Sequence, residues 1–287
     1  DCGMILVTGA NGLLGRDLLE RLQGVKVHAV VRCMPKNPVS SVKYHVLDLN
    51  EQWSVEQLPR GIKVVIHLAQ SAHFRDFPDS ALHIFKVNVD STARLLDYAK
   101  TIGVEQFVYA SSGGVYGSGK TAFNENSQII SSGNLGYYLG SKLSSEIIAQ
   151  SYSSLMKVKV LRFFFMYGRR QNRSMLLPRL VDLVKLGKPI ILEGENGIRI
   201  NPIHISDASK AVVASLEMPT SLIINIAGSE TLSIRDICCE IGTKVGEKPI
   251  FQRKDCEASD LIADISLMKN KLYDPKVKIK TGILDLL

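Results

Sequence analysis

Tyr138 and Lys142 stand four positions apart in the segment "GYYLGSK", residues 136–142. In a helix, positions i and i+4 lie on one face, so both side chains can reach one common group. A phenol has a pKa of about 10, and a nearby ammonium group favours its ionised form. The spacing therefore permits acid/base chemistry. An isolated pair of this kind is more often a surface tyrosine above a solvated lysine. The choice between an acid/base pair and two surface residues therefore depends on the other motifs of the chain.

A glycine-rich turn near the start of the chain indicates a phosphate site. The stretch "TGANGLLG" places Gly9, Gly12 and Gly15 between an apolar strand and an amphipathic helix. Gly9 permits a tight turn, Gly12 lets the backbone approach a pyrophosphate, and Gly15 allows close packing of helix on strand. The helix N-terminus adds free N–H groups and a positive dipole. The context predicts a dinucleotide site, although GxxGxxG differs from the commonest fingerprint, GxGxxG.

The ends of the next two strands suggest which dinucleotide is bound. Arg32 stands where an acidic residue would accept a hydrogen bond from the ribose 2′-hydroxyl of NAD, and Lys36 follows it. Cations at this place suit the 2′-phosphate of NADP, so NADP is the expected cofactor and NAD the alternative. Arg32 could instead be solvated or stack on adenine. Asp48, at the end of the third strand, could accept from the adenine amino group.

These residues need a parallel sheet to position them. Short apolar strands alternate with helices through the first part of the chain, which predicts βαβ units and a parallel sheet. The expected elements here are a strand, turn and helix over 4–22, strands at 25–32, 42–49, 62–69, 104–112 and 158–168, and helices at 91–103 and 137–154. After Gly168 the rhythm changes, with helices expected at 174–187, 206–217 and 233–246 and strands at 188–192 and 221–228.

The predicted fold class is α/β, a Rossmann-type doubly wound parallel sheet with a smaller, discontinuous α/β substrate lobe. Residues 1–165 form the expected dinucleotide-binding domain, and part of 190–225 returns to it. Residues 166–190 and 226–287 form the expected substrate lobe, with a ligand cleft between the two. Met4 is the expected natural start of the chain.

The composition is that of an ordinary globular protein. The 287 residues are 45% hydrophobic and 22% charged, and no apolar run is long enough to span a bilayer. The five cysteines lack metal-ligand spacing, so no metal site is expected and a cytoplasmic location is favoured. The net charge of +7 is scattered, and no basic stripe with interleaved aromatics suggests nucleic acid. A basic cleft for an anionic small ligand accounts for the surplus as well as a plain basic surface does.

Several further motifs occur in a fixed order along the chain. They are "HLA" at 67–69, "NVDST" at 88–92, "YASSGGVYG" at 109–117, "YLGSKLSSE" at 138–146, "LRFFFMYG" at 161–168 and "NPIHISDASKA" at 201–211. Together with the glycine turn, they resemble the extended short-chain dehydrogenases/reductases, and more narrowly the NAD-dependent epimerase/dehydratase family that acts on nucleotide sugars. The resemblance covers nearly the whole chain. Each motif is weak alone, and the order makes them strong together.

The resemblance implies a role for each motif residue. Tyr138 would be the acid/base on the substrate oxygen, Lys142 would lower its pKa and bind the nicotinamide ribose, and Ser112 would hold the same oxygen. The expected cofactor residues are Gly9, Asn11, Gly12, Leu13, Leu14, Gly15, Arg32, Asp48, Leu49, Leu68, Ala69, Gln70, Asn88, Ala110, Tyr138 and Lys142. The expected substrate residues are Ser112, Gly113, Phe165, Arg169, Arg179 and Arg199. The family also implies a homodimer built from the helices that carry Asn88 and the YxxxK motif.

Departures from the family pattern reduce the number of reactions that the sequence predicts. Gly113 and Gly114 stand where the related dehydratases carry an Asp-Glu pair and the decarboxylases a Glu, and glycine does no acid/base work. Phe165 replaces a substrate-contacting Asn, and it could stack on a base or sugar or fill the core. The expected function is hydride transfer at C4 of a nucleotide sugar, as a keto-reductase or dehydrogenase. The alternatives are a 4-epimerase with tightly bound NAD, a reductase of apolar carbonyls, and a non-enzymatic cofactor sensor.

Overall fold

The computed structural model describes residues 3–130 and 134–287. The chain divides into two compact units. The first comprises residues 1–115, 129–162 and 212–224, and the second comprises 116–128, 163–211 and 225–287. Each unit is discontinuous in sequence, so each is completed only by residues from the C-terminal half.

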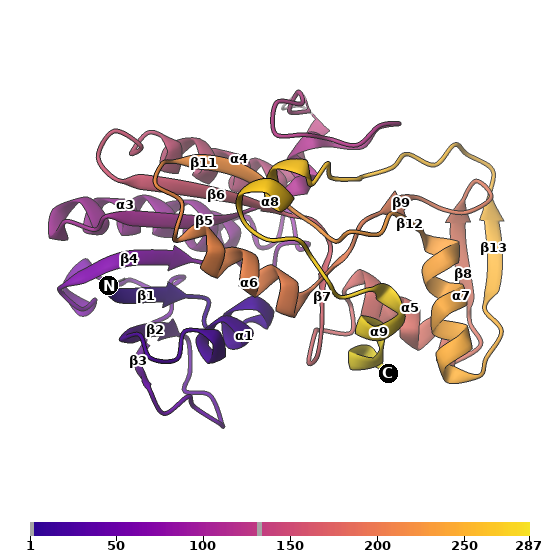
Figure 1. Ribbon diagram of the computed structural model, residues 1–287, viewed down its shortest axis with the longest axis horizontal. Helices are drawn as coiled ribbons and strands as arrows, with labels where there is room; N and C mark the ends of the chain where they lie inside the picture. The colour runs from indigo at the N-terminus through magenta and orange to yellow at the C-terminus, as the bar shows by residue number, and fades with distance from the viewer. Residues whose placement is uncertain (1–2, 131–133) are drawn as a thin grey trace. The chain divides into compact units, whose positions relative to one another are not determined.

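A seven-stranded sheet forms the centre of the first unit (Figure 1). Its strands are β1 (Met4–Thr8), β2 (Val27–Val31), β3 (Val42–Val46), β4 (Ile62–His67), β5 (Gln106–Ser112), β6 (Lys157–Phe163) and β11 (Leu222–Ile226). They lie in the order β11-β6-β5-β4-β1-β2-β3, and the pairs that join β3, β2, β1, β4 and β5 are parallel. The strand order reverses at β1 and β4, and ligands of such sheets bind beyond the carboxyl ends of the strands at this point. The predicted Rossmann-type fold is confirmed.

Helices follow most of these strands. They are α1 (Leu13–Arg21), η1 (Val55–Gln57), α2 (Ala81–Phe85), η2 (Lys86–Asp90), α3 (Ser91–Ile102), η3 (Gly113–Tyr116), α4 (Gly136–Gln150) and α6 (Ile205–Ser215), of which η3 and α6 cross the boundary between the units. The predicted end of α3 is confirmed, since Gly103 caps it with a left-handed φ of 74°. The sequence predicts no helix over 81–90, where α2 and a wider helical turn, η2, run directly into α3.

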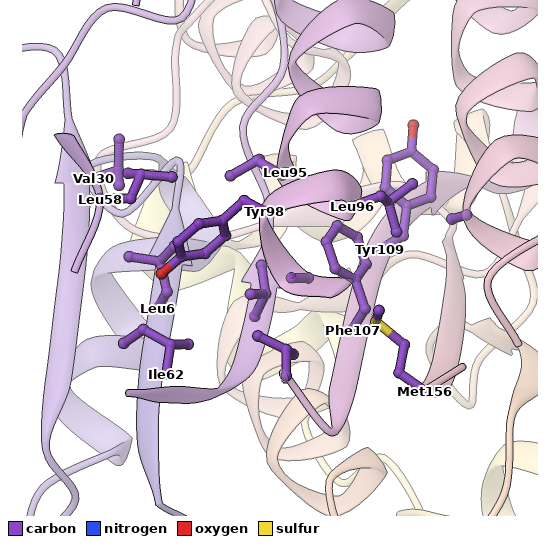
Figure 2. Close-up of a cluster of buried hydrophobic side chains, with 14 of the residues drawn as sticks. Leu6, Val30, Leu58, Ile62, Leu95, Leu96, Tyr98, Phe107, Tyr109 and Met156 are labelled. Atoms are coloured by element: carbon purple, nitrogen blue, oxygen red, sulfur yellow. The ribbon is translucent and has the colours of Figure 1, made fainter. Parts of the chain in front are cut away.

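One hydrophobic core of the first unit lies between the sheet and helices α3 and α4 (Figure 2). Leu95 and Leu96 on α3 are fully buried against Phe107 and Tyr109 of β5. The alternation of strand side chains places one set on this face, because successive residues point to opposite sides of a sheet. The core therefore fixes α3 and α4 on the sheet, and α4 carries Tyr138 and Lys142.

The second unit is built from short strands and helices. Its elements are β7 (Met166–Tyr167), α5 (Leu176–Lys185), β8 (Pro189–Glu193), β9 (Arg199–Ile200), β10 (Ile203–His204), β12 (Leu232–Ser233), α7 (Ile234–Val245), β13 (Ile250–Lys254), α8 (Ser266–Lys271), α9 (Ile279–Gly282) and η5 (Ile283–Leu286). A separate apolar core joins α5, α7, α9 and η5. Ser233 caps α7 through a reciprocal pair of hydrogen bonds with Asp236, and Gly246 ends the helix at a φ of 76°.

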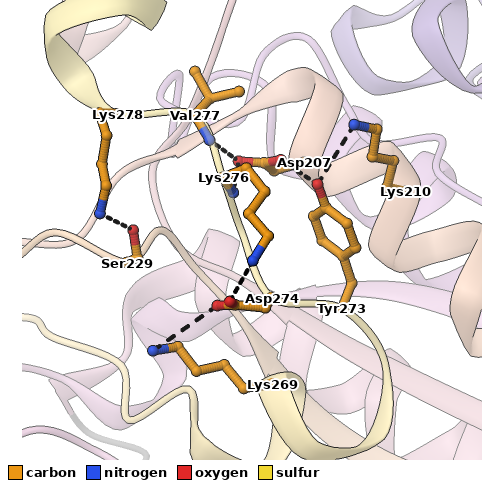
Figure 3. A network of polar contacts seen from close by, with 9 residues as sticks. All are labelled: Asp207, Lys210, Ser229, Lys269, Tyr273, Asp274, Lys276, Val277 and Lys278. Carbon is orange, nitrogen blue, oxygen red and sulfur yellow. Dashed lines mark hydrogen bonds and ion pairs between the residues drawn. The ribbon is translucent and has the colours of Figure 1, made fainter.

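One buried carboxylate holds the last part of the chain to this unit (Figure 3). Asp207 on α6 accepts hydrogen bonds from the Tyr273 hydroxyl at 2.9 Å and from the backbone N–H groups of Lys276 and Val277 at 2.9 and 2.7 Å. Three donors on one carboxylate offset the cost of burying its charge. The segment around residues 273–277 is thus fixed by a residue about 70 positions earlier.

In the described part of the chain, the helices are all too short or too polar to cross a lipid bilayer.

Candidate active site

The glycine turn after β1 has the geometry that the sequence predicts. Gly9 adopts a left-handed φ of 64°, and a Cβ there would lie 2.7 Å from the backbone nitrogen of Ala69. A Cβ on Gly15 would lie 2.4 Å from the Gly9 carbonyl oxygen. Both positions therefore require glycine, and Gly12 caps the N-terminus of α1. This backbone fits the pyrophosphate of a dinucleotide.

A cavity of about 240 Å³ opens next to this turn in the first unit. Most of the predicted cofactor residues line it, namely Gly9, Asn11, Gly12, Arg32, Asp48, Leu49, Leu68, Ala69 and Gln70. Ala10, Val30, Val31, Leu47, His83 and Val87 also line it and were not predicted. Leu13, Leu14 and Gly15 instead lie in the first turn of α1, with Leu14 and Gly15 buried. The cavity combines a phosphate-binding turn with apolar walls, which suits an adenine nucleotide.

Arg32 and Asp48 occupy different parts of the cavity wall. Arg32 is exposed directly after β2, where the ribose 2′-position of a dinucleotide is expected. Lys36 is exposed and is not a wall residue of this cavity. The carboxylate of Asp48 accepts one hydrogen bond from the backbone of Asn50 at 2.9 Å. Asn11 donates to the Cys33 carbonyl at 2.8 Å, which ties the glycine turn to the end of β2.

Tyr138 lies in the first turn of α4, and its hydroxyl donates to the side-chain oxygen of Gln70 at 2.9 Å. Its ring contacts Phe74, with a centroid separation of 5.0 Å. Burial raises the pKa of Tyr138 to about 12. The loss of hydration on burial therefore shifts this pKa in the direction opposite to the one expected from the ammonium group of Lys142. The phenol therefore stays protonated near neutral pH and can act as an acid.

Lys142 is 3% exposed and lies one helical turn beyond Tyr138. Its ammonium donates to the Ala110 carbonyl oxygen at 2.5 Å and lies 5.0 Å from the centroid of the Tyr109 ring. Burial lowers the pKa of Lys142 to about 8, and the carboxylate of Glu146 opposes that shift. The lysine is therefore mostly charged at pH 7. It is a buried group, which rules out the solvated surface lysine of the alternative interpretation.

Ser112 ends β5, and its hydroxyl oxygen accepts from the backbone N–H of Gly114 at 3.1 Å. A Cβ on Gly114 would lie 2.8 Å from Leu139, the residue after Tyr138, and 3.3 Å from the Ser112 hydroxyl oxygen. The Ser112 hydroxyl thus lies beside the first turn of α4. The Ser112 hydroxyl is thus paired with Gly114 and the Tyr138 hydroxyl with Gln70, and Gly113 between β5 and η3 is buried.

Asn88 connects three elements beneath α4. Its side-chain oxygen accepts from the backbone of Ser71 at 2.8 Å, and its amide nitrogen donates to the Ser141 hydroxyl at 2.9 Å. Ser141 in turn donates to the Tyr138 carbonyl oxygen at 2.6 Å. Asn88 is 2% exposed and is therefore a structural support for the first turn of α4 rather than part of the cavity wall.

His67 is a second buried support, at the end of β4. The Thr8 hydroxyl lies 2.6 Å from His67 Nδ1, and Thr92 lies 2.8 Å from Nε2. Because Thr92 donates its own hydrogen to the Asn88 carbonyl, it accepts from Nε2–H, and Nδ1 accepts from Thr8. Burial, assisted by the charge of Lys142, lowers the pKa of His67 to about 3. The neutral imidazole thus links β1 and β4 to η2 and α3.

A buried ion pair between Arg162 and Glu146 lies one helical turn beyond Lys142 on α4. Arg162 donates to both carboxylate oxygens of Glu146, through Nε at 3.2 Å and through a shorter Nη2 bond. Ser111 donates to the same carboxylate at 2.7 Å. The sequence does contain a signal for this role, because Glu146 lies four positions after Lys142 and so faces the same way in a helix.

The predicted substrate residues of the second unit have varied surroundings. Phe165 is half-buried and has a left-handed φ of 43°, a strained conformation for a residue with a bulky side chain. Arg169 is exposed and lies 3.5 Å from Asp285. Arg199 donates through Nε and Nη2 to Asp260 at 2.9 and 2.7 Å, so its guanidinium is already paired.

Arg179 differs from these arginines because it lines a groove in the second unit. The groove lies between α5 and β8, and its walls are mainly apolar, including Leu176, Leu180 and Ile198. Glu193 is the acidic residue on the same wall. The groove therefore has mainly apolar walls with one cation and one anion among them.

Comparisons with known proteins agree with this geometry. Residues 5–227 match the model of the "NAD dependent epimerase/dehydratase family", and the chain belongs to that family. An uncharacterized UDP-glucose epimerase of Bacillus subtilis is 28% identical, over 97% of this chain and 95% of the relative. A UDP-glucuronate 4-epimerase of Thermodesulfobacterium geofontis is 26% identical, over 84% of this chain and 77% of the relative.

Solved structures give the same result. The UDP-glucuronic acid 4-epimerase of Bacillus cereus, solved with UDP-glucuronic acid and NAD, superposes with a TM-score of 0.86 at 27% identity. The match covers 98% of this chain and 97% of that one. The predicted family, and with it the prediction of an enzyme, is confirmed.

Proposed function

We propose that this protein transfers hydride at C4 of a nucleotide sugar, and that its net reaction is 4-epimerisation. The observation that carries the proposal is the pair of Tyr138 and Lys142 on one face of α4, with Tyr138 half-buried and Lys142 buried against the Ala110 carbonyl of β5. A bound nicotinamide dinucleotide supplies the hydride acceptor and donor.

In the proposed mechanism, each residue acts on one oxygen of the sugar. Ser112 would hold the C4 oxygen, and Tyr138 as phenolate would take the hydroxyl proton while the C4 hydrogen leaves as hydride, for which a bound dinucleotide would be the acceptor. Lys142 binds the ribose hydroxyls of the cofactor and supplies positive charge near the phenol. With a cationic nicotinamide bound nearby, its charge and that of Lys142 would favour the phenolate and oppose the effect of burial on the Tyr138 pKa. For net epimerisation the keto-sugar would turn so that the hydride returns to the opposite face of C4, and the same phenol would then return the proton to the C4 oxygen.

The residues after Ser112 favour epimerisation over dehydration. Gly113 and Gly114 provide no side chain to expel water or to assist loss of a carboxyl group. Two of the relatives described above bear the name 4-epimerase, and a third is a UDP-glucose epimerase. Net keto-reduction by an added cofactor is the second candidate, because Arg32 suits NADP, which would have to exchange between turnovers.

The test is to incubate the protein with UDP-glucose or UDP-glucuronic acid and no added cofactor. Epimerisation predicts that the C4 epimer appears in the proton NMR spectrum until both epimers reach equilibrium. Net reduction or oxidation predicts instead that turnover requires added cofactor and changes the absorbance of the reduced nicotinamide. If C4 of every nucleotide sugar tested stays unchanged under both conditions, the proposal is wrong.

The variant Tyr138→Phe tests the acid/base assignment in the same assay. It removes one oxygen and leaves the ring contact with Phe74 in place, so the fold should persist. Turnover should fall by about 10² to 10⁴, the usual contribution of a positioned acid/base group. Cofactor affinity should change little, since Lys142 is intact. A variant with full activity would remove Tyr138 from the mechanism.

A further inference from the structure

His83 is a polar residue of the cofactor cavity that none of the family motifs quoted above includes. It lies on α2, one helical turn before Val87, and both side chains line the cavity. The same cavity wall holds Leu47, Asp48 and Leu49 at the end of β3. The charges of Asp48 and Arg32 act on the imidazole, which places the ring near the adenosine end of the cavity.

A buried serine fixes the orientation of this imidazole. The Ser71 hydroxyl lies 2.7 Å from His83 Nδ1 and accepts from the backbone N–H of His73 at 3.1 Å. Ser71 is 1% exposed, so its own hydrogen needs an acceptor inside the protein, and His83 Nδ1 is the acceptor within reach. The hydrogen of the neutral imidazole therefore resides on Nε2, which is left as a donor. Burial lowers the pKa of His83, which favours this neutral form.

The cavity wall offers both a donor on His83 and an acceptor on Asp48. Leu47, Leu49 and Val87 line the same cavity with apolar side chains that can pack on a purine. Adenine presents an amino group, which donates, with a ring nitrogen on either side of it, which accepts. We propose that His83 reads adenine together with Asp48, donating its Nε2 hydrogen to a ring nitrogen next to the amino group that Asp48 binds.

Ser71 gives this residue a second connection. The side chain of Ser71 holds His83, while its backbone N–H donates to Asn88, which supports the first turn of α4 through Ser141. One buried residue therefore positions both the adenine-reading imidazole and the support beneath Tyr138. Ser71 is a positioning residue, because it touches neither the nucleotide nor the reacting atoms.

The test removes single atoms from both partners. ADP, 1-deaza-ADP and 7-deaza-ADP are titrated calorimetrically into protein freed of copurified nucleotide. The first variant is His83→Asn, which keeps a polar atom at the position of Nδ1 but has none at that of Nε2. The second variant is His83→Gln, whose amide nitrogen reaches the position of Nε2. His83→Asn should weaken ADP about tenfold and leave the affinity for one deaza analogue unchanged, because that analogue already lacks the acceptor. His83→Gln should retain part of the ADP affinity.

Ser71→Ala separates positioning from folding in the same titration. It keeps the backbone N–H that binds Asn88, so thermal stability should change little. It should weaken ADP less than His83→Asn does, with the same dependence on one ring nitrogen. Equal losses for ADP and both deaza analogues in the His83 variants, or no loss at all, would overturn the proposal. The inference rests on the proposed dinucleotide site, and the assay contains no sugar, so a wrong sugar reaction would not affect its outcome.

Discussion

Lys142 gives the proposed site a pH dependence that binding can measure. Its pKa is lowered to about 8, and the proposed bond to the nicotinamide ribose uses the charged form. Raising the pH through about 8 removes that charge, so the affinity for NADPH or NADH should be flat below pH 8 and fall above it. Fluorescence titration of the reduced cofactor between pH 6.5 and about 10 follows this change.

The size of the effect follows from the pKa and from the strength of the bond. If only the charged lysine binds, the dissociation constant rises about fivefold from pH 8 to pH 9 and about ninefold from pH 9 to pH 10. The loss ends when the charge-assisted bond is gone, at a total of about 10- to 150-fold, because such bonds contribute about 1.5–3 kcal/mol. Lys142→Met should be flat with pH and bind as weakly as the wild type does at high pH.

Two controls separate this group from others that titrate nearby. Lys159 on β6 is also buried, and burial lowers its pKa to about 8, but it donates to Gln106 and has no part in the proposed site. Lys159→Met should therefore keep the wild-type pH profile. ADP lacks the nicotinamide ribose, so its affinity should not depend on Lys142. A wild-type profile that stays flat up to pH 10, or that is lost in Lys159→Met and kept in Lys142→Met, would refute the assignment.

Three further predictions concern other parts of the molecule. Wild-type protein should bind NADP(H) more tightly than NAD(H). Arg32→Asp should reverse that order, since a carboxylate repels the 2′-phosphate and accepts a hydrogen bond from a 2′-hydroxyl. Calorimetry that shows tighter NAD binding by the wild type would contradict this prediction. Glu146→Leu should lower the unfolding free energy by about 3–5 kcal/mol, because Arg162 loses its buried carboxylate. Adding Arg162→Met should recover most of that loss. Urea denaturation measures the unfolding free energies of the three variants, and additive losses in the double variant would argue against a coupled pair. The protein should be a dimer at micromolar concentration. Ile147 on α4 has a side chain that is 56% exposed, and Ile147→Asp should give monomers by light scattering. A monomeric wild type would exclude an interface through α4.

Much of the first unit could be predicted because its signals are local. The turn at Gly9 and the cap at Gly103 both need a left-handed backbone, and each ends a clear apolar pattern. The spacing of Tyr138 and Lys142 depends only on helix geometry. These features follow from sequence neighbours, so no knowledge of distant contacts is needed to find them.

The features that the sequence did not reveal depend on distant contacts. Burial of Tyr138 raises its pKa, and a spacing pattern carries no information about hydration. His83 joins the cavity only because β4 and α2 bring it next to the end of β3. The carboxylate partner of Arg199 is Asp260, 61 residues away, so its charge could be read from the sequence and its pairing could not.

The hydrogen bonds of Asp207 bear on how the protein matures during synthesis. A ribosome completes α6 long before it adds Tyr273, Lys276 and Val277, whose donors satisfy the Asp207 carboxylate. Until then, closing the second unit would bury a carboxylate without these donors, which is costly. The sheet of the first unit also cannot be completed early, since β11 at Leu222–Ile226 is its last strand to be synthesised. Folding therefore cannot proceed as two successive domains from the N-terminus, and a nascent chain halted before residue 277 should remain open to proteases in its second unit.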